Sequence, residues 1–246
     1  MYMGVIGNSP ESEILRELAG TRVLVTGLAR DIGVDIARAF ADVKCRLAVQ
    51  TNDLTPDMTA LVAVLSQSAA ELKLYTDPVR AAEPATRFAQ NCQQAFGGLD
   101  TVVNLQTITR GEMRHVAGEA DVERLITAKL TPLTHITRVC ANRMRVIFAE
   151  GLILNVLTMP APEGPREAAI AGIARTALAA MTRGEAGQWA DQSVRINCIA
   201  PKVDPIAQSG ASLKSEPDIA ALALYLASRR GRTLSSHIFD ADLSSH

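Results

Sequence analysis

Seven short apolar runs divide the chain into a regular alternation of buried and amphipathic segments. The segments between the runs repeat their apolar positions at helical spacing, whereas the runs are apolar at successive positions. Runs of this length are typical of strands that are covered on both faces. Six of them occupy residues 22–27, 46–50, 101–105, 152–157, 194–200 and 237–241, and a weaker one, LKLY, occupies residues 72–75. Seven strands separated by helices predict an α/β fold with a doubly wound, parallel, seven-stranded sheet and right-handed crossovers.

Four prolines predict where helices begin. A proline in the first turn costs a helix little, because the amide that proline lacks has no partner there. We therefore expect helices to start near Pro84, Pro132, Pro165 and Pro217. The chain has no linker, repeat or low-complexity tract, so one domain is predicted over residues 21–246. Residues 1–20 are interpreted as an N-terminal extension, either an interface arm or a frayed end.

Composition narrows the classes of partner. The 25 lysines and arginines nearly balance the 26 acidic residues, so the chain lacks the basic surface that binds nucleic acid. No stretch reaches the roughly 18 consecutive apolar residues of a membrane helix, and the first residues lack a signal-peptide pattern. We expect no nucleic-acid or membrane partner, a cytoplasmic location, and small molecules or other subunits as partners. The four cysteines form no CxxC pair, which favours reduced, buried thiols and no metal site.

A glycine turn follows the first predicted strand. Residues 26–33 read TGLARDIG and lead into a helical pattern. In such a turn, glycine lets the backbone approach a pyrophosphate, and the following helix presents free amides and the positive end of its dipole. The order of strand, turn and helix therefore predicts a dinucleotide site that includes Gly27, Ile32 and Gly33.

The segment LAGTRVLVTGLARDIG resembles the opening of the short-chain dehydrogenase/reductase family, whose TGxxxGxG motif it carries with Asp31 in place of the middle glycine. Resemblances at DTVVNLQT, GLILNVLT and RINCIAP extend the match from about Leu18 to Ser244. They imply a Rossmann fold and a nicotinamide cofactor. Asp31 has two interpretations. A carboxylate about 5 Å from a phosphate costs roughly 3 kcal/mol of binding energy, whereas an aspartate that caps the helix would point away from the ligand.

The resemblance also indicates which cofactor to expect. Members that prefer NAD carry an acid at the position of Thr51, where this chain has none. Arg30 matches the basic residue that NADP-preferring members present to the 2′-phosphate, and Asn52 could donate beside it. NADP(H) is therefore the predicted cofactor. Asp77 resembles the acid near the adenine, although an aspartate before proline also suits a turn.

Two other family motifs are kept only in part. Asn104 opens the segment that resembles NNAG, but residues 105–107 differ from it. Pro201 opens the segment that resembles a PG turn, and Lys202 replaces its glycine. The resemblance places Asn104 and Pro201 beside the cofactor. The chain between Pro201 and Pro217 is also shorter than the helical lid of many active members.

The family reaction depends on a tyrosine and a lysine in the motif YxxxK, which this chain does not contain. Counting from the flanking motifs places Ala171 at the position of the tyrosine and Arg175 at that of the lysine. Thr158 stands in the position of the catalytic serine, and Lys129 in that of the active-site asparagine. All four positions of the catalytic tetrad are therefore changed. Loss of the general acid alone costs about 10²- to 10⁴-fold in rate.

These changes lead to two hypotheses. The first is a degenerate family member that binds NADP(H), has little or no oxidoreductase activity of its own, and acts through association with other subunits. The second is an active NADP-dependent carbonyl reductase, similar to 3-oxoacyl-carrier-protein reductases. Its carbonyl substrate would take a proton from Lys129, His115 or His135, or from a partner chain.

Two further expectations concern ligands and subunits. Lys129 and Arg175 would bind a small anion, such as a carboxylate or phosphate, if both pointed into the pocket; otherwise each would pair with a neighbouring acid or face solvent. Family members commonly associate through the helices that hold residues 113–145 and 165–190. The second is rich in alanine and glycine, which suits a close interface and equally suits burial against the sheet. We expect a homo-oligomer, or a hetero-oligomer with another family subunit.

Overall fold

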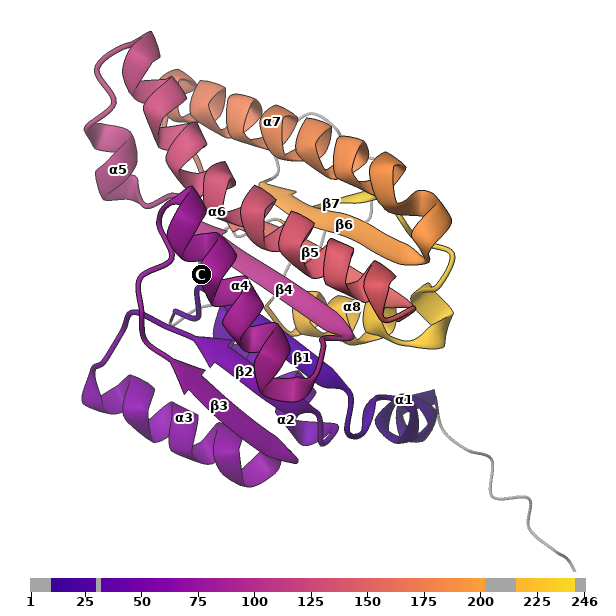
Figure 1. Cartoon of the computed structure of the whole chain (residues 1–246). Coiled ribbons are helices and arrows are strands. Elements are labelled where there is room, and N and C mark those ends of the chain that lie inside the picture. Colours follow the sequence, from indigo (N-terminus) through magenta and orange to yellow (C-terminus); the bar gives the residue numbers. More distant parts are fainter. Residues whose placement is uncertain (1–9, 30–31, 202–215, 242–246) are drawn as a thin grey trace, which may run out of the picture.

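The computed structural model describes residues 10–29, 32–201 and 216–241, and a seven-stranded sheet lies at its centre (Figure 1). The strands lie in the order β3-β2-β1-β4-β5-β6-β7, and every neighbouring pair is parallel. The predicted doubly wound, parallel α/β sheet is therefore confirmed. The strand bounds are β1 Arg22–Thr26, β2 Arg46–Gln50, β3 Glu71–Tyr75, β4 Thr101–Thr107, β5 Gly151–Thr158, β6 Val194–Pro201 and β7 Ile238–Ala241.

Two layers of helices cover the sheet, one on each face (Figure 1). Side chains alternate along β1, so that Val23 and Val25 pack in the cluster under α2 and α8, while Leu24 packs under α4 and α6. Burial on both faces explains why the five inner strands are largely apolar, whereas the edge strand β3 carries Glu71 and Lys73 and is only partly buried. One layer contains α2 (Ile32–Asp42), α3 (Pro56–Ser68) and α8 (Glu216–Ala227), and the other contains α4 (Ala82–Phe96), α6 (Glu119–Val146) and α7 (Pro165–Trp189).

The structure also contains shorter helices. α1 (Pro10–Leu18) precedes the first strand and buries Leu18 in the core. Its Glu13 pairs with Arg230 beyond the end of α8, at 2.7 Å. From residue 10 onward, the predicted N-terminal extension is therefore a helix that packs on the main domain. The remaining short elements are α5 (Arg110–Arg114) and the 3₁₀ turns Ala190–Gln192 and Arg229–Gly231.

The prolines mark helix starts in three of the four predicted places. Pro165 is the first residue of α7, and Pro217 and Pro84 lie in the first turns of α8 and α4. The expectation that a helix begins near Pro132 is wrong, because α6 begins at Glu119 and continues through Pro132. An interior proline removes the hydrogen bond to the carbonyl four residues earlier, that of Ala128. Both residues line the cavity described below, so the interruption lies at the candidate site.

The four cysteines are buried and unpaired, as predicted, and burial raises the pKa of Cys45 and of Cys198 to about 11. Among the residues that the structure describes, no group of three or more histidine, cysteine, aspartate or glutamate side chains could hold a metal ion. Within the same part of the chain, no helix combines the length and the apolar character needed to cross a membrane.

The strand order reverses between β1 and β4, which are neighbours in the sheet. Thr26 at the end of β1 lies opposite Asn104 in β4. The chain leaves β1 toward β2 and leaves β4 toward β5, so the two connections diverge and open a crevice at the carboxyl ends of the strands. Ligands of open α/β sheets bind in such crevices.

Candidate functional site

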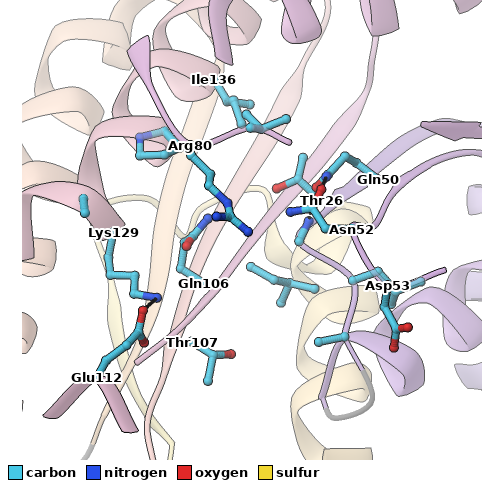
Figure 2. A pocket seen from close by; sticks show the side chains of 17 residues that line it. Thr26, Gln50, Asn52, Asp53, Arg80, Gln106, Thr107, Glu112, Lys129 and Ile136 are labelled. Atoms are coloured by element: carbon cyan, nitrogen blue, oxygen red, sulfur yellow. Dashed lines mark hydrogen bonds and ion pairs between the residues drawn. The ribbon is translucent and has the colours of Figure 1, made fainter. Parts of the chain in front are cut away.

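A cavity of about 590 Å³ lies at this reversal of strand order, between the carboxyl ends of β1, β2 and β4 and the middle of α6 (Figure 2). Its volume falls within the range of roughly 300–1,000 Å³ that is usual for small-molecule sites. Polar side chains reach it from the strand ends, from the loop after β3 and from α5 and α6. The lining residues are Thr26, Gly27, Leu28, Ala29, Gln50, Asn52, Asp53, Val79, Arg80, Leu105, Gln106, Thr107, Glu112, Ala128, Lys129, Pro132 and Ile136.

The glycines of the turn after β1 allow β4 to pack closely. Gly27 has a φ of 69°, and a Cβ atom there would lie 2.2 Å from the Leu105 carbonyl oxygen. A Cβ atom on Gly33 would lie 2.8 Å from the Leu105 Cδ1 atom. Ile32 begins α2 and is buried in the core. The two remaining candidates in this turn, Arg30 and Asp31, lie outside the described residues.

Gln50, the last residue of β2, closes one wall of the cavity. Its Oε1 atom accepts a hydrogen bond of 2.8 Å from the Gly27 amide. Its Nε2 atom donates to the Asn52 Oδ1 atom at 2.8 Å and to the Asp77 carbonyl at 3.1 Å. The Gly27 amide is thus engaged by the protein itself. Gln50 was not among the residues predicted from the sequence, although a polar residue that ends an apolar run at the carboxyl edge of the sheet was a usable signal.

Four predicted cofactor residues have structural partners and do not line this cavity: Thr51, Asp77, Asn104 and Pro201, whose carbonyl accepts a hydrogen bond from Arg175. The buried Thr51 hydroxyl donates to the Leu28 carbonyl at 2.8 Å and accepts from the Asp53 amide at 3.1 Å. Asn104 is fully buried and donates to Asn155 Oδ1 at 2.9 Å. Asp77 offers its backbone carbonyl to Gln50. Of the polar predictions in this region, Asn52 is the side chain that lines the cavity.

The residues at the four tetrad positions contact different neighbours. Thr158 is buried, and its hydroxyl shares a hydrogen bond of 2.9 Å with the Thr107 hydroxyl. Ala171 is fully buried in an apolar cluster. Arg175 forms an ion pair with Asp240 and donates to the Pro201 carbonyl at 3.2 Å.

The fourth position, Lys129, lines the cavity and donates to Glu112 Oε1 at 2.7 Å (Figure 2). Lys129 and Arg175 therefore form ion pairs with different acids, and Arg175 does not line the cavity that Lys129 enters. Of the two alternatives for this pair, the structure shows the second: each cation is paired with a neighbouring acid, and the two do not hold one anion together. His115 bonds to the Gly111 carbonyl at 2.6 Å, and neither it nor His135 lines the cavity.

Arg80 and Gln106 were also missed by the sequence analysis. Arg80 lies in the loop between β3 and α4, and Gln106 lies near the end of β4. Figure 2 shows both side chains extending into the cavity toward one another. The position of Arg80, just after a strand and before a helix, would have indicated it, because such loops gather at the carboxyl edge of the sheet.

Glu112 gives the site a pH-dependent contact. Burial acts to raise the pKa of its carboxyl, but hydrogen bonds from Lys129 and from Thr109 together outweigh burial, so the pKa lies below the ordinary value of 4.5. A carboxyl whose pKa is lower in the folded state stabilises the fold above its unfolded pKa. This contribution is lost as the pH falls through the folded pKa.

Glu112→Gln is therefore expected to destabilise the protein slightly at neutral pH, by less than about 1 kcal/mol, because the carboxylate is partly exposed and solvent screens the pair. The difference from the unsubstituted chain should shrink as the pH falls below about 4. Urea unfolding across this pH range measures it. Glu163→Gln removes a well-exposed carboxylate elsewhere and serves as the control. A Glu112 difference that stayed constant down to about pH 3 would contradict the linkage.

Comparisons with known proteins point to one family. The 3-oxoacyl-[acyl-carrier-protein] reductase of Chlamydia pneumoniae is 25% identical over 230 residues, which span 86% of this chain and 91% of that protein. Glucose 1-dehydrogenase 2 of Bacillus subtilis is 24% identical over 191 residues, which span 76% of this chain and 72% of that protein.

Solved structures share the fold. A short-chain type dehydrogenase/reductase from Mycobacterium marinum superposes with a TM-score of 0.74 at 17% identity, covering 93% of this chain and 96% of that one. An NAD⁺-bound xylitol dehydrogenase gives a TM-score of 0.72 at 17% identity, covering 91% of this chain and 98% of that one. The family model described as short chain dehydrogenase matches residues 21–206, well over half of the sequence. This chain therefore belongs to the short-chain dehydrogenase family.

Proposed function

We propose that this protein binds NADP(H) at the reversal of strand order, has little or no oxidoreductase activity of its own, and acts through association with other subunits. The observation that carries the loss of activity is the burial of Ala171. This residue stands where the family resemblance places the proton-donating tyrosine, and it is fully enclosed by apolar side chains. A methyl group transfers no proton, so hydride transfer to a carbonyl would lack its general acid.

The other tetrad positions support the same proposal. Arg175 is held by Asp240 and the Pro201 carbonyl, and an arginine stays protonated, so it is a poor substitute for the lysine of the motif. Thr158 shares its hydrogen bond with Thr107, which leaves it able to orient a carbonyl but not to protonate one. With alanine at position 171, there is no tyrosine phenol there for Arg175 or Thr158 to activate.

Cofactor binding is supported by the cavity and by the family. The cavity lies where doubly wound folds bind dinucleotides, and its lining is rich in polar side chains. The preference for NADP(H) over NAD(H) rests on the absence of an acid at Thr51, on Asn52 in the lining, and on Arg30. Asp53 also lines the cavity and accepts a hydrogen bond of 2.9 Å from the Thr55 amide.

Association is supported by the outer surface of α7. The exposed positions of this helix include Ile173 and several small residues, among them Ala169, Ala180 and Gly184. Small side chains let two helices approach closely, and an exposed isoleucine gains by burial. Sedimentation of the purified chain, alone and mixed with other family members of its host, tests for homo- and hetero-oligomers.

A second candidate is an active NADP-dependent carbonyl or 3-oxoacyl reductase. Two observations favour it: the Chlamydia pneumoniae relative carries that activity in its name, and the Lys129 ammonium lines the cavity as a proton-bearing group. Its ion pair with Glu112 would have to open for Lys129 to reach a substrate.

The test is calorimetric titration with NADPH and NADH, followed by assays of NADPH oxidation with a panel of ketones and 3-oxoacyl thioesters. We expect micromolar binding of NADPH, weaker binding of NADH, and no oxidation that depends on substrate. Substrate-dependent turnover that Lys129→Met abolishes would establish the second candidate instead. An absence of binding at millimolar cofactor would exclude both and leave a scaffold used for its surfaces.

A further inference from the structure

Among the residues that the structure describes, two cations line the cavity, and they differ in their partners. Lys129 is paired with Glu112 at 2.7 Å, and only a small part of its side chain is exposed. Arg80 forms no hydrogen bond or ion pair with any of the described residues, and it is exposed to the cavity and to solvent. An anion that enters the cavity therefore meets one cation whose charge is already balanced and one that is not.

The opposite wall offers few free donors. The Gly27 amide is bonded to Gln50 Oε1, and both hydrogens of the Gln50 carboxamide are used, by Asn52 and by the Asp77 carbonyl. In a phosphate-binding turn, backbone amides of this kind would otherwise point at the ligand. The Gly27 amide and the Gln50 carboxamide are therefore not available to a negatively charged group, and side chains on the other side of the cavity can supply the donors.

Arg80 has the position and the chemistry for this recognition. Its side chain crosses from the loop after β3 into the middle of the cavity and points toward Gln106 at the end of β4 (Figure 2). A guanidinium offers several N–H donors in a rigid fork that matches two oxygens of one phosphate. Gln106 adds a carboxamide, which can donate to the same group.

We propose that Arg80 binds a phosphate group of the nucleotide in this cavity and is the main determinant of its affinity. This inference rests on the proposed cofactor binding and adds to it the residue and the ligand group involved. Two groups of NADP(H) have the required chemistry, the 2′-phosphate and the pyrophosphate. They are distinguished by comparing NADPH with NADH, which has the pyrophosphate alone.

The test compares Arg80→Gln, Arg80→Lys and the unsubstituted chain by calorimetric titration with NADPH and with NADH. Because hydrogen bonds to charged groups contribute strongly, Arg80→Gln should weaken NADPH binding by about 10- to 100-fold. Arg80→Lys keeps the charge but not the fork, and its affinity should lie between the two. Arg87→Gln removes the same charge from an exposed position on α4, outside the cavity, and should leave binding unchanged.

The pattern of loss identifies the phosphate. A loss confined to NADPH assigns Arg80 to the 2′-phosphate, and an equal loss for both cofactors assigns it to the pyrophosphate. If Arg80→Gln binds both within about twofold of the unsubstituted chain, the role of Arg80 is overturned while cofactor binding stands. If the unsubstituted chain binds neither cofactor at millimolar concentration, both proposals fail. Thermal unfolding of each variant verifies that it is folded.

Discussion

The double substitution Ala171→Tyr with Arg175→Lys, which rebuilds the family motif, is expected to destabilise the protein by about 2–4 kcal/mol and to produce no NADPH oxidation. Ala171 is fully enclosed in a cluster that includes Met113, Leu157 and Met159. A phenol ring placed there must displace these side chains, and over-packing of a core costs about 1–3 kcal/mol. Lysine at position 175 also loses the fork that holds both Asp240 and the Pro201 carbonyl.

Thermal unfolding measures this effect. For a domain of this size, each kcal/mol corresponds to about 2–4 °C, so the melting temperature should fall by roughly 4–16 °C. Ala60→Tyr adds the same ring to an exposed position of α3, away from the proposed interface helix, and should change stability by no more than about 0.5 kcal/mol. A double variant that is stable and oxidises NADPH would mean that the cluster opens onto an intact pocket, and that only the acid had been missing.

Ala171 also illustrates how much of the fold and of the site could be predicted from the sequence. Strand positions were recognisable because the inner strands are buried on both faces, and counting from them located residue 171. The apolar cluster that contains Ala171 also includes Met113 of α5 and Met159 after β5, and these segments come together only in the folded chain. Local patterns carry no information about such contacts.

The partners of polar and charged side chains could not be predicted from local sequence patterns either. Asn104 was assigned to the cofactor from its motif, but its carboxamide bonds to Asn155 on the neighbouring strand, 51 residues later. Arg175 finds its acid at Asp240 in β7, and Lys129 finds Glu112 in a different helix. The sequence supplied both cations, whereas the packing of α5 against α6 and of α7 near β7 determines which acids they meet.

Gly27→Ala is expected to be the most damaging single substitution at the site, with a loss of about 3 kcal/mol or more of stability and a loss of cofactor binding. Two costs add at this position. Alanine in the left-handed conformation costs about 1–2 kcal/mol. The new Cβ atom would also lie 2.2 Å from the Leu105 carbonyl oxygen, so β1 and β4 would have to separate beside the cavity.

Gly97→Ala separates the two costs. Gly97 has nearly the same φ, 72° against 69°, but a Cβ atom there meets nothing within 4 Å. This variant should lose only the conformational contribution of about 1–2 kcal/mol and should keep its cofactor affinity. The difference between the two variants in urea unfolding then measures the close approach of β4 to the turn. Equal losses would show that backbone conformation alone accounts for the glycine, and that the turn after β1 has room for a side chain.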